Sequence, residues 1–121
     1  MERPYTYTRT THLMHILNHL YDNKNVPQIP IQPEHKTAII EVFNEISEAF
    51  NHCCPPARKN FLNYYFVLRK ICILLGFNQY LVLFPIPFKN NKNIMEHEAI
   101  WKKICVYNHD RWINHPGFNL L

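Results

Sequence analysis

The sequence predicts an all-α fold, a compact bundle of about four to five helices with one central buried helix. Apolar residues recur at helical spacing in several segments, and prolines and asparagines separate these segments. Only two glycines occur in 121 residues, whereas all-β folds need many tight turns that favour glycine. With 47% hydrophobic and 18% charged residues, the composition is that of a globular chain. The length corresponds to a single domain, residues 1–121.

The N-terminal segment is expected to be extended and then helical. Residues 1–8 alternate Tyr and Thr for part of their length, which favours an extended chain. A first helix capped by Thr10 or Thr11 should follow and run to about Tyr21. The Pro- and Asn-rich stretch 22–32 should be a loop.

The second and third helices are predicted from apolar periodicity. The second should begin at Pro33, which suits a first helical turn, and end before Pro55. The third should run from about Ala57 to Leu75, almost without a polar face, and Gly76 should cap it. The second helix places its apolar residues on one face: Ile39, Val42, Phe43, Ile46, Ala49 and Phe50. Its glutamates should form a solvated opposite face: Glu41, Glu45 and Glu48.

The C-terminal third should contain a short helix, a long helix and a packed tail. The short helix covers about 79–83, and a polar turn follows at 89–93. Asn93 and Glu96 have the spacing of a capping box at the start of the last helix, which should bury Trp101. Three apolar residues of the tail should pack back on the bundle: Trp112, Ile113 and Phe118.

Charge and cysteine usage limit the class of protein. The formal charge of +4 permits a nucleic-acid partner without requiring one. Cys53 and Cys54 are adjacent, while Cys72 and Cys105 lie in apolar helical patterns, so reduced thiols are expected rather than a disulfide framework. The longest apolar run, residues 61–77, is too short and too charged to span a bilayer, so no membrane association is expected.

Three histidines are the candidate metal ligands. His12, His15 and His19 would share one face of a helix, which is the geometry of a metal site. A fourth ligand could come from one of three residues: His52, Cys53 or Cys54. The alternative is a polar face that happens to carry histidines. Because no C-x-x-C pair occurs, we expect neither a metal nor another cofactor.

No enzyme active site is expected. A thiol of Cys53 or Cys54 beside His52 lacks the orienting third group that nucleophilic catalysis requires. Two glycines placed as here cannot form a phosphate-cradling loop. The sequence therefore predicts a protein that is not an enzyme and has no small-molecule substrate.

Basic side chains flank the predicted third and last helices. The candidate nucleic-acid or partner-binding residues are Arg58, Lys59, Lys89, Lys92, Lys102 and Lys103. If they converge on one surface, they could neutralise phosphates of a nucleic acid. The alternative is that they are scattered charges that keep the protein soluble.

Three blocks in a fixed order resemble one viral family. They read C-P-P-A-R-K-N-F-L-N-Y-Y-F-V-L-R-K-I-C-I-L-L-G from Cys54, L-F-P-I-P-F-K from Leu83 and A-I-W-K-K-I-C from Ala99. The pattern is similar to that of the late transcription factor 3 family of poxviruses and their giant-virus relatives. Residues 16–50 resemble the preceding family segment more loosely.

The resemblance implies a viral late transcription factor that acts with promoter DNA, the viral RNA polymerase and other late factors. It also implies the viral factory in the host cytoplasm, or the virion, as the location. Poxvirus members carry an N-terminal zinc-ribbon-like element, but no paired cysteines precede Cys53 in this sequence. Two alternatives stay open: a structural or scaffolding viral protein, and a small metalloprotein or hydrolase that uses His12, His15, His19 and Cys54.

Overall fold

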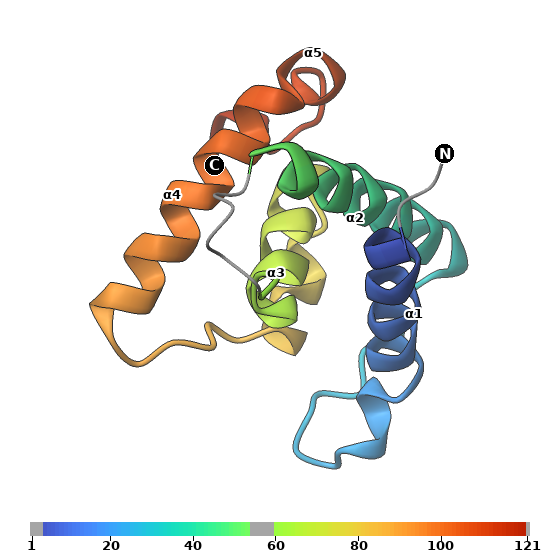
Figure 1. The fold of residues 1–121 in the computed structure, drawn as a ribbon. Coiled ribbons are helices and arrows are strands. Elements are labelled where there is room, and N and C mark those ends of the chain that lie inside the picture. Colours follow the sequence, from blue (N-terminus) through green and yellow to red (C-terminus); the bar gives the residue numbers. More distant parts are fainter. Residues whose placement is uncertain (1–3, 54–59, 121) are drawn as a thin grey trace.

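The computed structural model describes residues 4–53 and 60–120, with side chains described for residues 8–53 and 60–119. These residues form five α-helices and three 3-10 helices, and no strand occurs among them. The predicted all-α fold is therefore confirmed (Figure 1). In chain order the elements are α1 (Pro4–Asn18), η1 (Leu20–Asp22), α2 (Pro33–Cys53), α3 (Tyr64–Leu75), η2 (Asn78–Leu83), α4 (Asn91–Tyr107), α5 (His109–Trp112) and η3 (Phe118–Leu120).

Helices α2 and α3 form the centre of the bundle. Helix α2 packs against α1, α3 and α4, and Figure 1 shows α3 between α1 on one side and α4 on the other. The predicted central helix is thus α3, and it buries an almost continuous apolar set: Phe66, Val67, Leu68, Ile71, Cys72 and Leu74. No helix among the described residues is both long enough and apolar enough to cross a membrane.

The two tryptophans join the C-terminal helices to this core. Trp101 on α4 and Trp112 on α5 are 1% and 0% exposed, and their rings stack with centroids 5.8 Å apart. The predicted burial of Trp101 is therefore confirmed. The tail prediction holds for Trp112 and for Phe118, which packs against the core, but Ile113 is 49% exposed and that part was wrong. Successive residues in helical conformation point about 100° apart, so Trp112 faces the core while Ile113, the C-cap of α5, is exposed.

Helix α1 begins earlier than its composition indicates. It starts at Pro4, so the prediction of an extended chain was wrong for residues 4–8. Proline fits the first turn of a helix, and contacts to α2 stabilise the segment that follows. Arg9 Nη1 donates hydrogen bonds of 2.9 Å to Ser47 Oγ and to Asn51 Oδ1. Such contacts offset the low helix propensity of Thr and Tyr.

Two other predicted helix ends were also wrong. Helix α1 ends at Asn18, and Tyr21 belongs to the 3-10 helix that follows. Helix α3 begins at Tyr64 rather than near Ala57, because the side chain of Asn63 accepts hydrogen bonds from the backbone N–H groups of Tyr65 and Phe66. An asparagine in this position satisfies N–H groups that have no partner within the helix.

Helix α4 starts before the predicted capping box. Asn90 is its N-cap and accepts a hydrogen bond from the backbone N–H of Asn93, so the helix begins at Asn91. The residues expected to form a polar turn at 89–93 are therefore mostly helical. The ends of α2, the 3-10 helix at 78–83 and the loop after residue 22 agree with the predictions.

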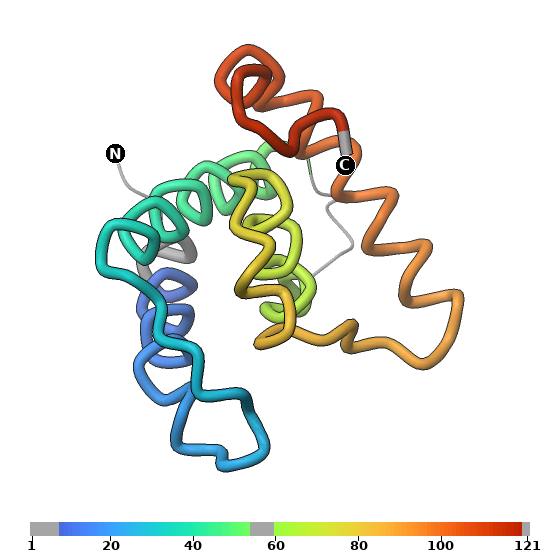
Figure 2. Tube along the Cα trace, turned by 180° about the vertical axis from the view of Figure 1, so that it is seen from behind, coloured from blue at the N-terminus to red at the C-terminus, as the bar shows by residue number. Residues whose placement is uncertain are grey.

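Both glycines occupy positions that need them. Gly76 ends α3 with a φ of 77°, a left-handed conformation that other residues rarely adopt. Gly117 donates its N–H to the carbonyl of Leu74 at 2.9 Å, and a Cβ there would collide with the carbonyl oxygen of Ile73. Figure 2 shows the result, with the C-terminal segment lying close to the end of α3.

Candidate nucleic-acid interface

Four of the predicted basic residues lie on or beside α4. Lys92, Lys102 and Lys103 are on the helix, and Lys89 immediately precedes its N-cap. All four side chains are exposed, and none forms an ion pair with a carboxylate of the described residues. These four residues are called the α4 lysines below.

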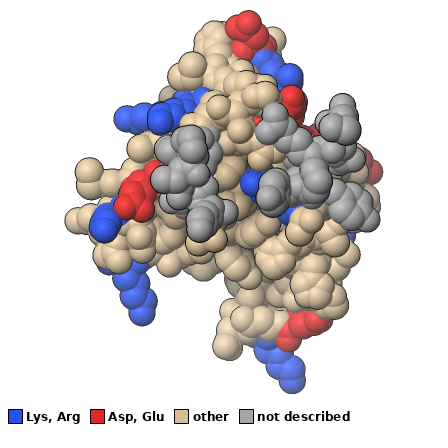
Figure 3. Space-filling model, viewed as in Figure 1, with Lys and Arg blue, Asp and Glu red and all other residues tan. Residues whose placement is uncertain are grey.

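Helical geometry arranges the α4 lysines as a stripe rather than a cluster. Lys92 and Lys103 point within about 20° of each other but lie roughly 16 Å apart along the axis. Lys102 points about 100° away from Lys103. The exposed Glu96 lies between Lys92 and Lys103 along the helix axis and on the same side of the helix. Figure 3 shows blue atoms along the margin that α4 forms in Figure 1, with red atoms between them.

Arg58 and Lys59 lie outside the described residues, so the candidate site consists of the α4 lysines alone. Because α3 begins at Tyr64, neither residue belongs to its first turn, where the predicted start near Ala57 would have placed them.

Two further basic residues face the interior of the structure. Lys70 Nζ forms an ion pair with Glu98 at 2.8 Å and lies 5.4 Å from the centre of the Phe66 ring. Arg69 Nη1 donates to the backbone carbonyls of Leu81 and Phe84 and so holds η2 against α3. These contacts support the fold, and the candidate phosphate-binding groups are the α4 lysines.

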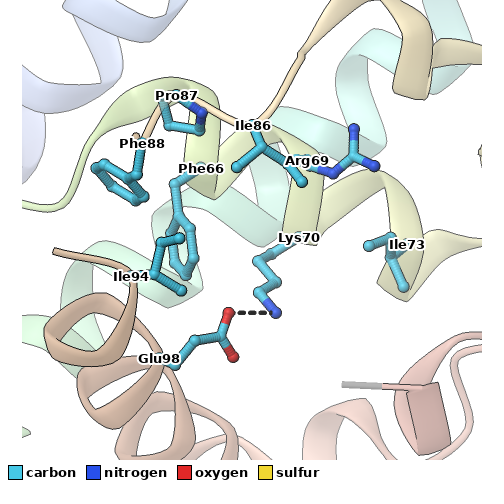
Figure 4. A pocket seen from close by; sticks show the side chains of 9 residues that line it. All are labelled: Phe66, Arg69, Lys70, Ile73, Ile86, Pro87, Phe88, Ile94 and Glu98. Carbon is cyan, nitrogen blue, oxygen red and sulfur yellow. Dashed lines mark ion pairs between the residues drawn. The ribbon is translucent and has the colours of Figure 1, made fainter. Parts of the chain in front are cut away.

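An apolar pocket of about 180 Å³ lies between α3, α4 and the loop after η2. Figure 4 shows Phe66, Phe88 and Ile94 on one side of it and the Lys70–Glu98 ion pair along another. The remaining lining residues are Arg69, Ile73, Ile86 and Pro87. Ile86 is 63% exposed, although an isoleucine is normally buried. The sequence did not predict this pocket, although the F-P-I-P-F block forms the loop that lines one side of it.

Tyr107 at the end of α4 is a second surface residue that sequence reasoning missed. It is 41% exposed, and its ring stacks on that of His52 from α2 with centroids 5.3 Å apart. Its spacing could have indicated this position, because Tyr107 follows Lys103 by one helical turn and lies on the same face of α4. The exposed side of α4 thus carries an aromatic ring in addition to lysines.

The three candidate metal-binding histidines divide between two neighbourhoods. The His12 ring contacts Tyr64 at 4.5 Å between centroids, whereas the rings of His15 and His19 contact each other at 4.3 Å. His19 also contacts Asp22 at 2.9 Å. Within residues 4–53 and 60–120, no group of three His, Cys, Asp or Glu side chains is close enough to hold a metal ion.

The described cysteines have raised thiol pKa values, which is typical of unreactive cysteines. Burial raises the pKa of Cys72 to about 12 and that of Cys105 to about 11, and it also raises the pKa of Cys53. A nucleophilic cysteine needs the opposite shift, toward the thiolate. The Cys53 thiol donates to the carbonyl of Lys103 at 3.8 Å, and Cys54 lies outside the described residues.

Comparison with known sequences gives one family and three viral relatives. The sequence model of the family described as Poxvirus Late Transcription Factor VLTF3 like matches residues 12–113. A protein of Acanthamoeba polyphaga mimivirus, named as a presumed transcription factor, is 39% identical over 101 residues, or 84% of this chain. A similarly named protein of Paramecium bursaria Chlorella virus 1 is 41% identical over 80 residues, or 66% of this chain. A second mimivirus protein with such a name is 30% identical over 104 residues.

These matches cover only part of each relative. The chain spans 22% of the length of the first mimivirus protein, 22% of the Chlorella virus protein and 38% of the second mimivirus protein. No solved structure is significantly similar to this chain.

Proposed function

The chain belongs to the poxvirus late transcription factor VLTF3-like family, and from this premise we propose that it is a binding domain of late viral transcription. In this proposal it binds promoter DNA and proteins of the viral RNA polymerase machinery, and it does not catalyse a reaction. The proposed location is the cytoplasmic viral factory of the infected cell, which imaging of a tagged chain during infection would test.

The observation that carries the DNA-binding part is the stripe of α4 lysines. All four are exposed, and their ammonium groups are not neutralised by carboxylates of the described residues. The separation of Lys92 and Lys103, roughly 16 Å, corresponds to about five base-pair steps of B-form DNA. A lysine stripe of this length can contact several phosphates while carrying no base information.

The test is DNA binding at several salt concentrations by the wild type and by a variant with Lys92, Lys102 and Lys103 each replaced by Glu. Each lost phosphate contact should flatten the salt dependence by about 0.9 log units per decade. Weakening should be similar for all DNA sequences, because phosphate contacts do not distinguish bases. Lys24→Glu is the charge-matched control for a single reversal, Lys103→Glu, since Lys24 is exposed but lies in the loop before α2.

A second variant tests the sign of the interaction. Glu96 is exposed between the lysines, where its charge should repel phosphates. Glu96→Gln should therefore strengthen DNA binding, while Glu34→Gln, the same change at another exposed position at the start of α2, should not. Wild-type affinity and salt dependence in the triple variant would contradict DNA binding through α4 and favour the scaffolding alternative.

For the protein partner, the supporting feature is the apolar pocket beside Ile86. A partly open apolar pocket of about 180 Å³ fits an apolar side chain of a protein, whereas a sugar–phosphate backbone has no apolar group that would fill it. Ile86→Asp should abolish co-purification with viral polymerase proteins from infected cells and leave DNA binding intact. Ile113→Asp is the control, because Ile113 is 49% exposed and does not line the pocket.

A further inference from the structure

A shallow hollow lies at the C-terminal end of α4, where the stripe of α4 lysines ends. It has a volume of about 470 Å³ and is lined by Cys53, Lys102, Lys103, Val106 and Tyr107. Val106 is 76% exposed and Tyr107 is 41% exposed, so the floor of the hollow offers apolar surface to the solvent. Two of the five lining residues are lysines, and none is acidic.

The aromatic ring in this hollow stacks on a histidine of another helix. Tyr107 stacks on His52 with an angle of 14° between the two ring planes and 5.3 Å between centroids. Because His52 belongs to α2, the contact joins the ends of two helices and gives the tyrosine ring a neighbour on one face. A ring that is already ordered loses less conformational entropy when a ligand stacks on it.

Charges near the hollow favour an anionic ligand. Lys102 and Lys103 line it, and the Cys53 thiol donates a hydrogen bond to the backbone carbonyl of Lys103. Burial raises the pKa of this thiol, so it adds no negative charge near neutral pH. The nearest glutamate along α2 is Glu48, one turn before His52, and it does not line the hollow.

We propose that this hollow binds an unpaired base of single-stranded nucleic acid, which stacks on Tyr107 while Lys102 and Lys103 contact the adjoining phosphates. Planar aromatic surface flanked by cations is the usual means by which proteins bind single strands without regard to sequence. The hollow is open and shallow, so a planar base can lie on its aromatic surface, whereas the apolar anchor residue of a peptide is normally held in an enclosed pocket. The inference rests on the proposed function and specifies the form of nucleic acid that this end of α4 contacts.

The test compares labelled twelve-nucleotide oligo-dT, the same strand with abasic sites, and a duplex of equal length by fluorescence anisotropy. Oligo-dT should bind about tenfold more tightly than the abasic strand, because both carry the same phosphates and only one can stack. Tyr107→Ala and Tyr107→Leu should each remove this difference. Leu keeps much of the apolar bulk of the side chain, so a folded Leu variant distinguishes loss of stacking from loss of structure.

A matched control is available on another helix. Tyr65 on α3 is 39% exposed, nearly the same as Tyr107, and Tyr65→Ala should leave the preference for oligo-dT unchanged. Equal binding of intact and abasic strands by the wild type would overturn the inference. So would displacement of oligo-dT by polyglutamate at equal charge, which would indicate a surface for acidic protein segments.

The experiment separates this inference from the proposed function. Salt-dependent duplex binding that the triple Lys→Glu variant loses, without any preference for intact single strands, overturns only the base-stacking site. A preference for intact strands that depends on Tyr107, with no duplex binding, supports the stacking site and contradicts promoter-duplex binding through α4.

Discussion

Trp112 Nε1 donates a hydrogen bond of 2.9 Å to Oε1 of Glu45, and this contact fastens α5 to the middle of α2. Trp112 is completely buried, so its N–H cannot donate a hydrogen bond to water instead. Asn108 Nδ2 lies 3.5 Å from the backbone carbonyl of Glu45, and Arg111 lies 3.7 Å from the other carboxylate oxygen. Glu45 was expected to belong to a solvated face, and it instead anchors the C-terminal segment.

Replacement of Glu45 should therefore destabilise the fold. Glu45→Ala leaves the buried Trp112 N–H without its acceptor. This should lower the unfolding free energy, measured by urea denaturation, by about 1–3 kcal/mol. Glu45→Gln keeps an oxygen acceptor and should lose less. Glu48→Ala, a change of the same type at an exposed position of α2, should stay within about 0.5 kcal/mol of the wild type. Equal losses for Glu45→Ala and Glu48→Ala would show that the hydrogen bond does not stabilise the fold.

Trp101 should contribute to stability through packing. It is 1% exposed, and its Nε1 has no hydrogen-bond partner among the described residues. Trp101→Ala should cost about 3–5 kcal/mol. Trp101→Phe, which keeps an aromatic ring and has no N–H to satisfy, should cost clearly less. A Trp101→Ala variant that melts within about one or two degrees of the wild type would contradict this assignment.

The sequence predicted those elements whose signals are local. Helix α2 has an amphipathic pattern and a proline at its first position, and both its ends agree with the prediction. Helix α3 was predicted too long, because Phe61 and Leu62 continue the apolar pattern although neither is helical. Hydrophobicity cannot mark that boundary, since it depends on hydrogen bonds accepted by the Asn63 side chain.

Features that depend on distant contacts could not be predicted. The early start of α1 is supported by Arg9, which binds Ser47 and Asn51 on a different helix. The partners of Glu45 likewise lie far along the chain, so its helix pattern alone indicated a solvated position. For the candidate site, the α4 lysines were identified from the sequence, but the pairing of Tyr107 with His52 required the packing of α2 against α4.

Metal removal should leave the stability of the chain unchanged. The ring of His12 contacts Tyr64, while His15 and His19 contact each other, and no ligand cluster occurs among the described residues. We expect the same melting temperature before and after treatment with a strong chelator. A large decrease, restored by added Zn²⁺ and absent in a His15→Ala variant, would indicate a metal site, because metal binding to such sites contributes directly to folding.

Alkaline pH should weaken the fold through its buried thiols. The pKa of Cys72 rises to about 12 because burial disfavours the thiolate, whereas the ordinary value is 9.0. The folded state therefore holds the proton more tightly, so its advantage is complete below pH 9.0 and is lost as the pH rises toward 12. In that range one such thiol lowers the unfolding free energy by at most about 1.4 kcal/mol per pH unit.

Urea unfolding of the wild type and of Cys72→Ala across this pH range tests the effect. Cys72→Ala should be less stable at pH 7, because it leaves a small cavity in α3's buried face. Its unfolding free energy should nevertheless fall less steeply than that of the wild type between pH 9 and 11. Tyr64, whose pKa is also raised mainly by burial, remains in both proteins and contributes equally to the two slopes. Parallel slopes for the two proteins would show that Cys72 keeps an ordinary pKa in the folded state.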